Sequence, residues 1–270
     1  MIKIEKDYNC IPDSLRTDEE GLRSRIAANT NEKRLEVIRM GRYPDPQNAA
    51  PFDTRYKYDD IKCQLESIYN KKCCYCESSN EQLTIEHYRP KRGGYYWLAF
   101  SWDNLFLCCT TCNIRKKSQF PIQGTPVKYD PKRDTINSIN SLGRSYDLIE
   151  RPLIINPENV DSSALDTIRF DKHGGISSSD TRMAKTIEVC ALDRKALQET
   201  RQQIWDDLRA NIADAIVSAN GSIDKLTALI AHDLKAFIRK MEDPKTPYRS
   251  FYKFVLKAGW VNEYIYSAIV

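Results

Sequence analysis

The stretch CCYCESSNEQLTIEHYRPK, residues 73–91, decides the fold, because it joins two closely spaced cysteines to a glutamate–histidine pair. A second cysteine pair lies in NLFLCCTTCNIRKK, residues 104–117. Each pair has two residues between its cysteines, and thiolates held in two such turns suit the tetrahedral coordination of a structural zinc ion. We therefore predict one zinc ion with four ligands, Cys73, Cys76, Cys109 and Cys112.

The remaining cysteines are expected to pack rather than to bind metal. Cys74 and Cys108 stand beside the two pairs but outside their spacing, and three others are isolated, namely Cys10, Cys63 and Cys190. Free cysteine packs as a small hydrophobic residue. A disulfide framework is not indicated, because six of the nine cysteines crowd into residues 73–112. A redox pair of the thioredoxin type would need a βαβ context that the sequence lacks.

The segment between the two cysteine pairs predicts a strand, a loop, a second strand and a helix. Residues 83–88 are rich in β-branched and aromatic side chains, and Pro90 followed by a glycine pair opens a loop. The second strand is expected at residues 104–108 and the helix at about residues 110–119. Four protein ligands close the zinc shell, so this metal is expected to be structural rather than catalytic.

The flanking regions are expected to be mostly helical, which gives an α+β fold class with a zinc-stapled core. Residues 1–70 form a predicted N-terminal helical region, residues 71–122 the core, and residues 123–270 a C-terminal region. Within the first region, helices are expected at Asp18–Met40 and Asp53–Asn70, because apolar residues recur there at helical spacing.

The C-terminal region is expected to hold a short strand pair and then helices. The apolar runs Leu153–Ile155 and Ile168–Phe170 predict the two strands. Asp193 is a candidate N-cap for the first long helix. The helices are expected at residues 193–220, 223–241 and 248–260. The last region carries no chemical signature and is interpreted as a cap or a docking surface.

Composition is that of an ordinary soluble globular protein, with 41% hydrophobic and 29% charged residues. No stretch approaches the ~20 apolar residues of a membrane span, and the N-terminus has no signal-peptide core, so we expect a cytosolic protein without membrane contact. The net charge is +4, but residues 86–133 hold nine Lys and Arg against three Asp and Glu. Such a basic segment favours a polyanionic partner, or it is simply a solvated face.

Three short patterns occur in a fixed order within the core. They are Glu86-His87-x2-Pro90, Asn104-Leu105-x2-Cys108, and Cys109-x2-Cys112-Asn113-x2-Lys116. Together they resemble the signature of HNH endonucleases of the ββα-metal superfamily. The resemblance implies that His87 is the general base, that Glu86 and Asn113 hold a divalent cation such as Mg²⁺ or Mn²⁺, and that Asn104 anchors the loop.

These residue types suit that chemistry on their own account. A neutral imidazole is well placed to take a proton from water near pH 7. Oxygen ligands suit Mg²⁺, which binds through one or two protein groups plus substrate phosphate. Four basic side chains could neutralise flanking phosphates, namely Arg89, Lys91, Lys116 and Lys117. Strand alternation sends Glu86 and His87 to opposite faces, so the strand is expected to end or twist there.

A closer resemblance spans about residues 60–205. The core patterns, followed by RPLIINPENVD, FDKHGGI and TIEVCALDRKAL, resemble HNH subunits of bacterial Septu-type anti-phage systems and related retron-associated HNH proteins. This resemblance implies an ABC/SMC-like ATPase as a partner subunit. In the retron-associated forms it also implies a reverse transcriptase and its RNA–DNA product.

The sequence alone leaves alternatives open. The chain could be a non-catalytic zinc module that binds nucleic acid or scaffolds a complex, although such a module has no need of Glu86, His87 and Asn113. The substrate could be phage DNA or a structured RNA such as tRNA. His173 is expected in a turn and His232 on a helix, without chemistry. The aromatic residues between Tyr95 and Trp102 either pack the loop or stack on bases.

Overall fold

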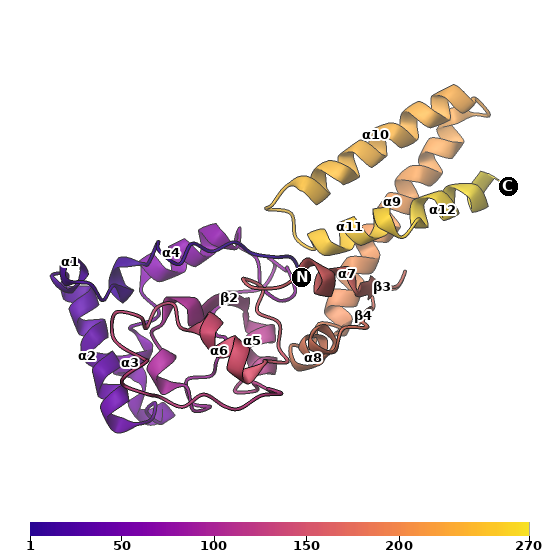
Figure 1. Cartoon of the computed structure of the whole chain (residues 1–270). Coiled ribbons are helices and arrows are strands. Elements are labelled where there is room, and N and C mark those ends of the chain that lie inside the picture. The colour runs from indigo at the N-terminus through magenta and orange to yellow at the C-terminus, as the bar shows by residue number, and fades with distance from the viewer. Residues whose placement is uncertain (270) are drawn as a thin grey trace.

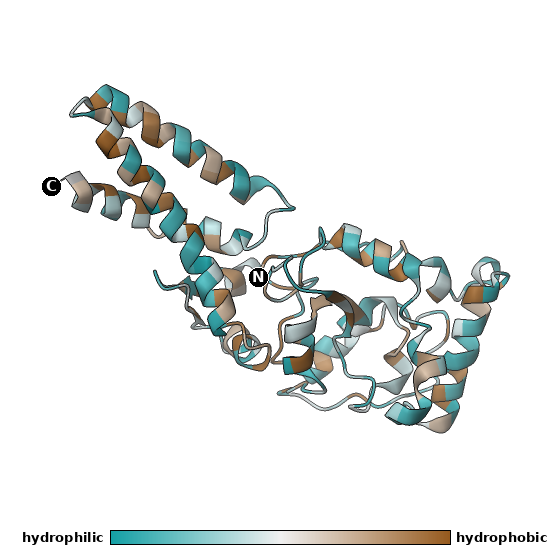
Figure 2. Ribbon diagram, turned by 180° about the vertical axis from the view of Figure 1, so that it is seen from behind, coloured by the Kyte–Doolittle hydropathy of each residue, from teal (hydrophilic) through white to brown (hydrophobic). Residues whose placement is uncertain are grey.

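The computed structural model describes residues 1–269, and it has an elongated shape. Figure 1 shows a body and, at one end of it, an arm of helices, with the N-terminus at the junction between them. The arm consists of α9 (Lys195–Ala219), α10 (Ile223–Glu242), α11 (Arg249–Lys257) and α12 (Trp260–Ile269). Apolar and polar residues alternate along its helices (Figure 2), as expected where each helix packs only one face on its neighbours.

The ββα core forms as predicted. The strands β1 (Leu83–His87) and β2 (Leu105–Cys109) pair antiparallel, with His87 opposite Leu105. The helix α5 (Thr110–Lys116) follows directly, and β2 is buried along its whole length. Two short 3₁₀ turns, at Tyr96–Leu98 and Trp102–Asn104, shape the connection between the strands. An α+β fold that is mainly helical is therefore confirmed.

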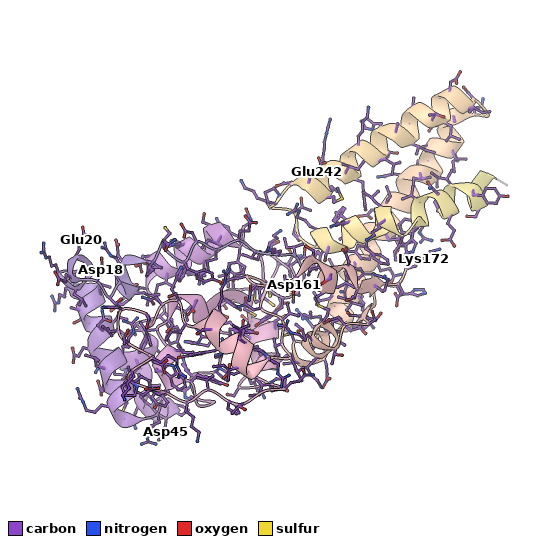
Figure 3. The ribbon with its side chains drawn as sticks, in the orientation of Figure 1. Asp18, Glu20, Asp45, Asp161, Lys172 and Glu242 are labelled. Atoms are coloured by element: carbon purple, nitrogen blue, oxygen red, sulfur yellow. The ribbon has the colours of Figure 1, made fainter. Side chains whose placement is uncertain are left out.

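The N-terminal region departs from prediction in one place that matters for the site. The first predicted helix is nearly correct, as α1 (Glu19–Leu22) and α2 (Arg25–Met40). Asp18 caps α1 and, with Glu20, accepts hydrogen bonds from Arg16 at the far end of the body (Figure 3). The second predicted helix is wrong between residues 54 and 58. Those residues form a turn between α3 (Ala50–Asp53) and α4 (Asp59–Ile68), because Tyr58 adopts an extended backbone.

The predicted strand pair is half wrong. Ile168–Phe170 is a strand, β3, but it pairs with β4 (Ile176–Ser178) across a tight turn. Leu153–Ile155 is not a strand, because its amides are used elsewhere. The Leu153 amide donates to Pro121 O at 2.8 Å, and the Ile155 amide donates to Thr186 Oγ1 at 2.8 Å.

Three further helices complete the body. They are α6 (Gly143–Glu150), α7 (Ser162–Asp166) and α8 (Thr181–Val189), and one of them, α8, packs against β4. The β3–β4 hairpin also contacts the arm, since the Lys172 Nζ (Figure 3) lies 3.0 Å from a carboxylate oxygen of Glu263 in α12. The last helix predicted, at residues 248–260, is α11, which ends at Lys257, and a further helix that was not predicted, α12, follows Gly259, whose φ is +74°.

The cap of α9 is not the predicted one. Arg194 takes the N-cap position, while Asp193 instead accepts a hydrogen bond from the Ile176 amide at 2.8 Å. This places the Arg194 side chain at the junction of arm and body.

The hydrophobic core runs through all three predicted regions, and it joins residues such as Leu15, Phe106 and Trp205. The boundaries at residues 70 and 122 therefore stay a prediction. Two of the isolated cysteines are not core residues, since Cys10 and Cys63 are exposed, whereas Cys190 is buried as expected. Among the described residues, no helix combines the length and the apolar character that a membrane crossing requires.

Candidate metal centre and active site

The four predicted cysteines come together in one buried cluster. The sulfur atoms of Cys73, Cys76, Cys109 and Cys112 all lie within 4.8 Å of one another. The Cys76 and Cys109 sulfurs are 3.7 Å apart. A tetrahedral zinc site with Zn–S bonds of about 2.3 Å has sulfurs about 3.8 Å apart, so the cluster fits a zinc ion. The turn after α4 supplies the first pair, and the start of α5 supplies the second.

Cys74 and Cys108 are buried beside the cluster, as expected of packing residues. They also form a tight three-thiol group with Cys73, whose sulfur is 3.8 Å from that of Cys108. The four-thiol set supplies the complete ligand number that a structural zinc site needs, whereas the other group is one ligand short.

Arg194 is a charged neighbour of the cluster that no sequence pattern indicated. Its guanidinium lies 3.4 Å from the Cys112 sulfur, 3.8 Å from that of Cys109 and 3.9 Å from that of Cys76. It also pairs with Glu81 at 2.7 Å. Zinc bound to four thiolates carries a net charge of −2, which a half-buried guanidinium offsets. The N-cap residue of α9, the first helix of the arm, thus contacts the cysteine cluster.

His87 ends β1 with one ring nitrogen engaged. Its Nε2 lies 2.9 Å from the Ala99 carbonyl oxygen. Because a carbonyl only accepts, Nε2 must carry the proton, and a neutral ring then keeps its lone pair on Nδ1. Burial lowers the pKa of His87 well below its ordinary value, and the nearby charge of Lys91 lowers that pKa further. The imidazole is therefore neutral near pH 7, with Nδ1 as its basic atom.

Glu86 lies on the opposite face of β1, against α5. It forms an ion pair with Lys116 at 2.6 Å, and Lys116 also donates to the His87 carbonyl at 3.0 Å. Both side chains are almost completely buried. Burial raises the pKa of Glu86, although the Lys116 ammonium acts to lower it. The carboxylate is thus available to a cation only in competition with Lys116.

Asn113 faces β1 on the same side as Glu86. Its Nδ2 donates to Thr84 Oγ1 at 3.0 Å, and Thr84 stands two residues before Glu86 on the same face of the strand. The amide oxygen is left as its ligand atom. The Glu86 carboxylate and the Asn113 amide oxygen are oxygen donors, the type that Mg²⁺ and Mn²⁺ bind while keeping several waters.

Asn104 holds the two ends of the connecting loop. Its Oδ1 accepts from the Arg89 amide at 2.7 Å, while its Nδ2 donates to the carbonyls of Arg89 and Leu98 at 3.0 and 3.1 Å. Because Ala99 follows Leu98, the bond to the Leu98 carbonyl also supports the part of the loop that faces His87.

The basic residues predicted to contact phosphates are not equally available. Arg89 is buried between Asp147 and Glu150, with its guanidinium nitrogens 2.6 and 2.7 Å from their carboxylate oxygens. The expectation that Arg89 contacts phosphate is therefore corrected. The same correction applies to Lys116, which is buried against Glu86. Lys117 is exposed, and the side chain of Lys91 is 12% exposed.

The other aromatic and histidine residues lie where packing predicts. Trp97, Phe100 and Trp102 are fully buried in the loop between the strands, which favours packing over base stacking. His173 is exposed in the β3–β4 turn, and His232 is exposed on α10.

Comparison with known proteins gives one informative similarity. No family model matches the chain. The chain is 34% identical over 178 residues to the Septu protein PtuB of Bacillus mycoides (strain KBAB4). The similarity covers 58% of this chain and 55% of that protein, so the chain spans about half the length of its relative. The predicted resemblance to a Septu PtuB-like protein is thereby confirmed.

Proposed function

We propose that this chain is a metal-dependent HNH endonuclease that hydrolyses phosphodiester bonds in nucleic acid, with DNA as the first candidate substrate. The observation that carries the proposal is the orientation of His87. Its Nε2 is held by the Ala99 carbonyl, which leaves the lone pair on Nδ1, and the ring stands at the end of β1, one residue after Glu86. Burial alone lowers the pKa of a histidine, so the proposal rests on the place of this ring, at the end of β1 and directly after Glu86, with Nδ1 as the basic atom.

In this mechanism His87 Nδ1 takes a proton from the attacking water. Glu86 and Asn113 would hold the divalent cation, which supplies charge stabilisation to the phosphate and its leaving oxygen. Asn104 donates to the Leu98 carbonyl and so supports the loop whose Ala99 carbonyl faces His87 Nε2. Lys91 and Lys117 remain the basic residues able to reach flanking phosphates.

The similarity to a Septu protein supports a role in anti-phage defence. We propose that the chain is an effector subunit that acts with an ABC/SMC-like ATPase. In a retron-type setting the partners would be a reverse transcriptase and its RNA–DNA product, and the substrate could then be tRNA.

A second candidate function rests on the Glu86–Lys116 pair. A cation site that is already neutralised and buried is what a non-catalytic zinc scaffold would also show. The two functions differ in whether His87 and a divalent cation are needed.

The test is a cleavage assay on supercoiled plasmid and on total tRNA, with Mg²⁺ or Mn²⁺, at matched zinc content and with the ATPase subunit of its system present. His87→Ala should lower the cleavage rate by about 10²- to 10⁴-fold, the usual contribution of a general base. His232→Ala is the matched control, since that histidine is exposed on α10. Equal cleavage by wild type and His87→Ala would sink the assignment, and no cleavage by either would favour the scaffold.

A further inference from the structure

We propose that Asp53, the last residue of α3, and Tyr56, in the turn after it, are positioning residues of the nuclease site. Asp53 positions the Lys91 ammonium and Tyr56 positions the His87 imidazole, so that the ammonium and the general base can act on the same phosphate. This inference rests on the proposed function and extends it to the N-terminal region.

Asp53 gathers three donors on a single carboxylate oxygen. Its Oδ1 accepts from the hydroxyl of Tyr43 at 2.8 Å, from the hydroxyl of Tyr56 at 3.0 Å, and from Lys91 Nζ at 3.0 Å. Lys91 also donates to the Tyr56 hydroxyl. These bonds cross from α3 to the loop after β1, so they fix the lysine relative to the strand that ends in His87.

Two aromatic rings complete the seat of the Lys91 ammonium. Its Nζ lies 3.9 Å from the ring centroid of Tyr56 and 4.7 Å from that of Tyr43. A surface lysine samples many rotamers, whereas this one is confined by a carboxylate and two ring faces. Its side chain is nevertheless 12% exposed, so a phosphate can approach it. The Asp53 carboxylate offsets part of the lysine charge, so Lys91 is suited to donate a fixed hydrogen bond to a phosphate rather than to attract one from a distance.

Tyr56 also contacts the candidate base. Its ring meets the His87 imidazole edge-on, with centroids 4.6 Å apart and planes at 85°. The Ala99 carbonyl holds the imidazole through Nε2, and the Tyr56 ring closes another side of it. Tyr56 is 5% exposed, so its position is set by packing rather than by solvent.

The charges around Lys91 give the inference a readout. Burial lowers the pKa of Lys91 to about 8, and the Asp53 carboxylate opposes that change. The positive charges of Arg92 and Lys57 lower the pKa of Lys91 further. The other titratable groups near Lys91 are Tyr43, Tyr56, His87 and Glu86. Asp53→Asn removes the carboxylate that contacts the ammonium directly, so Lys91 should lose its proton at a lower pH.

The experiment compares the pH dependence of kcat/KM for plasmid cleavage in wild type, Asp53→Asn and Asp59→Asn. Asp59→Asn makes the same change of charge in the exposed first turn of α4. We expect the alkaline limb of the profile to move to lower pH by at least half a unit, with a rate at pH 8 that is lower by about twofold or more, in Asp53→Asn alone. A wild-type profile in Asp53→Asn, with only a lower Tm, would show a structural tie and overturn the inference.

A second measurement does not depend on activity. The ¹⁵N resonances of the His87 ring report its tautomer, and they are assigned with His87→Ala because the chain has 3 histidines. Tyr56→Leu should mix the tautomers, whereas Tyr56→Phe, which keeps the ring, should keep Nε2 protonated. An unchanged His87 signal in Tyr56→Leu would overturn the role of Tyr56. If wild type does not cleave, the proposed function fails, and the ring resonances still decide the positioning of His87.

Discussion

The two candidate metal-binding groups of this protein lie on the same ββα core but are built differently. The cysteine cluster has four buried thiols within 4.8 Å of one another. The Glu86–Asn113 group has a carboxylate paired with Lys116 and an amide bonded to Thr84. The first is assembled from two tight turns and holds the fold, whereas the second is occupied by internal partners. A structural metal site benefits from being complete, while a catalytic one must exchange partners when substrate arrives.

Lys116 is the side chain that creates this difference. Its ammonium supplies the positive charge that keeps Glu86 stable when buried, as a divalent cation would. Three substitutions test the comparison. They begin with a ligand of the cysteine cluster, where the largest effect is expected, and end with Arg194, which only contacts that cluster.

The largest effect is expected from Cys109→Ser. Structural zinc contributes on the order of 10 kcal/mol to the folding of small zinc modules, so loss of one ligand should abolish zinc binding and the cooperative unfolding transition. Zinc content measured by mass spectrometry and thermal unfolding followed by circular dichroism check the prediction. Cys63→Ser is the control, because that thiol is exposed. Full zinc content and an unchanged Tm in Cys109→Ser would contradict a four-cysteine site.

An intermediate effect is expected from Lys116→Met. Removing one partner of a buried ion pair leaves an uncompensated charge, which costs about 3–5 kcal/mol. Because Glu86 then lacks its cation, added Mg²⁺ or Mn²⁺ should restore more stability in this variant than in wild type. Chemical unfolding with and without the metal measures both quantities.

The control for this variant is Lys116→Met combined with Glu86→Gln, in which the metal should have no extra effect. If Mg²⁺ and Mn²⁺ stabilise the single and double variants equally, Glu86 does not bind the metal. The Glu86–Asn113 group would then not be a metal site that can be compared with the cysteine cluster.

The smallest effect is expected from Arg194→Gln. Charged hydrogen bonds of this kind are worth about 1.5–3 kcal/mol, so the protein should still fold and bind zinc. Loss of the guanidinium beside three sulfurs should speed zinc release to a chelator such as EDTA several-fold. Arg209→Gln, a change within α9 at a partly exposed ion pair, should release zinc at the wild-type rate. Equal rates in the two variants would mean that Arg194 does not support the cluster.

Most of the core was predictable because its signals are local. The cysteine spacing, the strand residues around Ile85 and the helix after Cys109 each depend on neighbours within a few positions. The errors arose where distant segments decide. Leu153–Ile155 has strand composition, but its amides bond to Pro121 and Thr186. Residues 54–58 have helical spacing, but they form a turn. Asp53, just before that turn, and Tyr56, within it, accept hydrogen bonds from Lys91.

The candidate site divides in the same way. The order of Glu86, His87, Asn104 and Asn113 along the chain is itself enough to indicate the nuclease signature. Which of the basic residues could meet phosphate did not follow from that order. Arg89 and Lys116 differ little from Lys117 in sequence, yet the first two are buried in ion pairs with residues 30 or more positions away. Charge and motif predict the partner, but burial decides which charges reach it.

By itself, the sequence determined the four-cysteine set, the ββα order of the core, and the choice of His87 as candidate base. Only the tertiary structure decided that Nε2 of His87 faces the Ala99 carbonyl, that Lys116 neutralises Glu86, and that Arg194 reaches the cysteine cluster from 82 residues away. The physical reason is desolvation. A buried charge must find a partner, and the folded chain selects that partner from whichever distant segment packs against it.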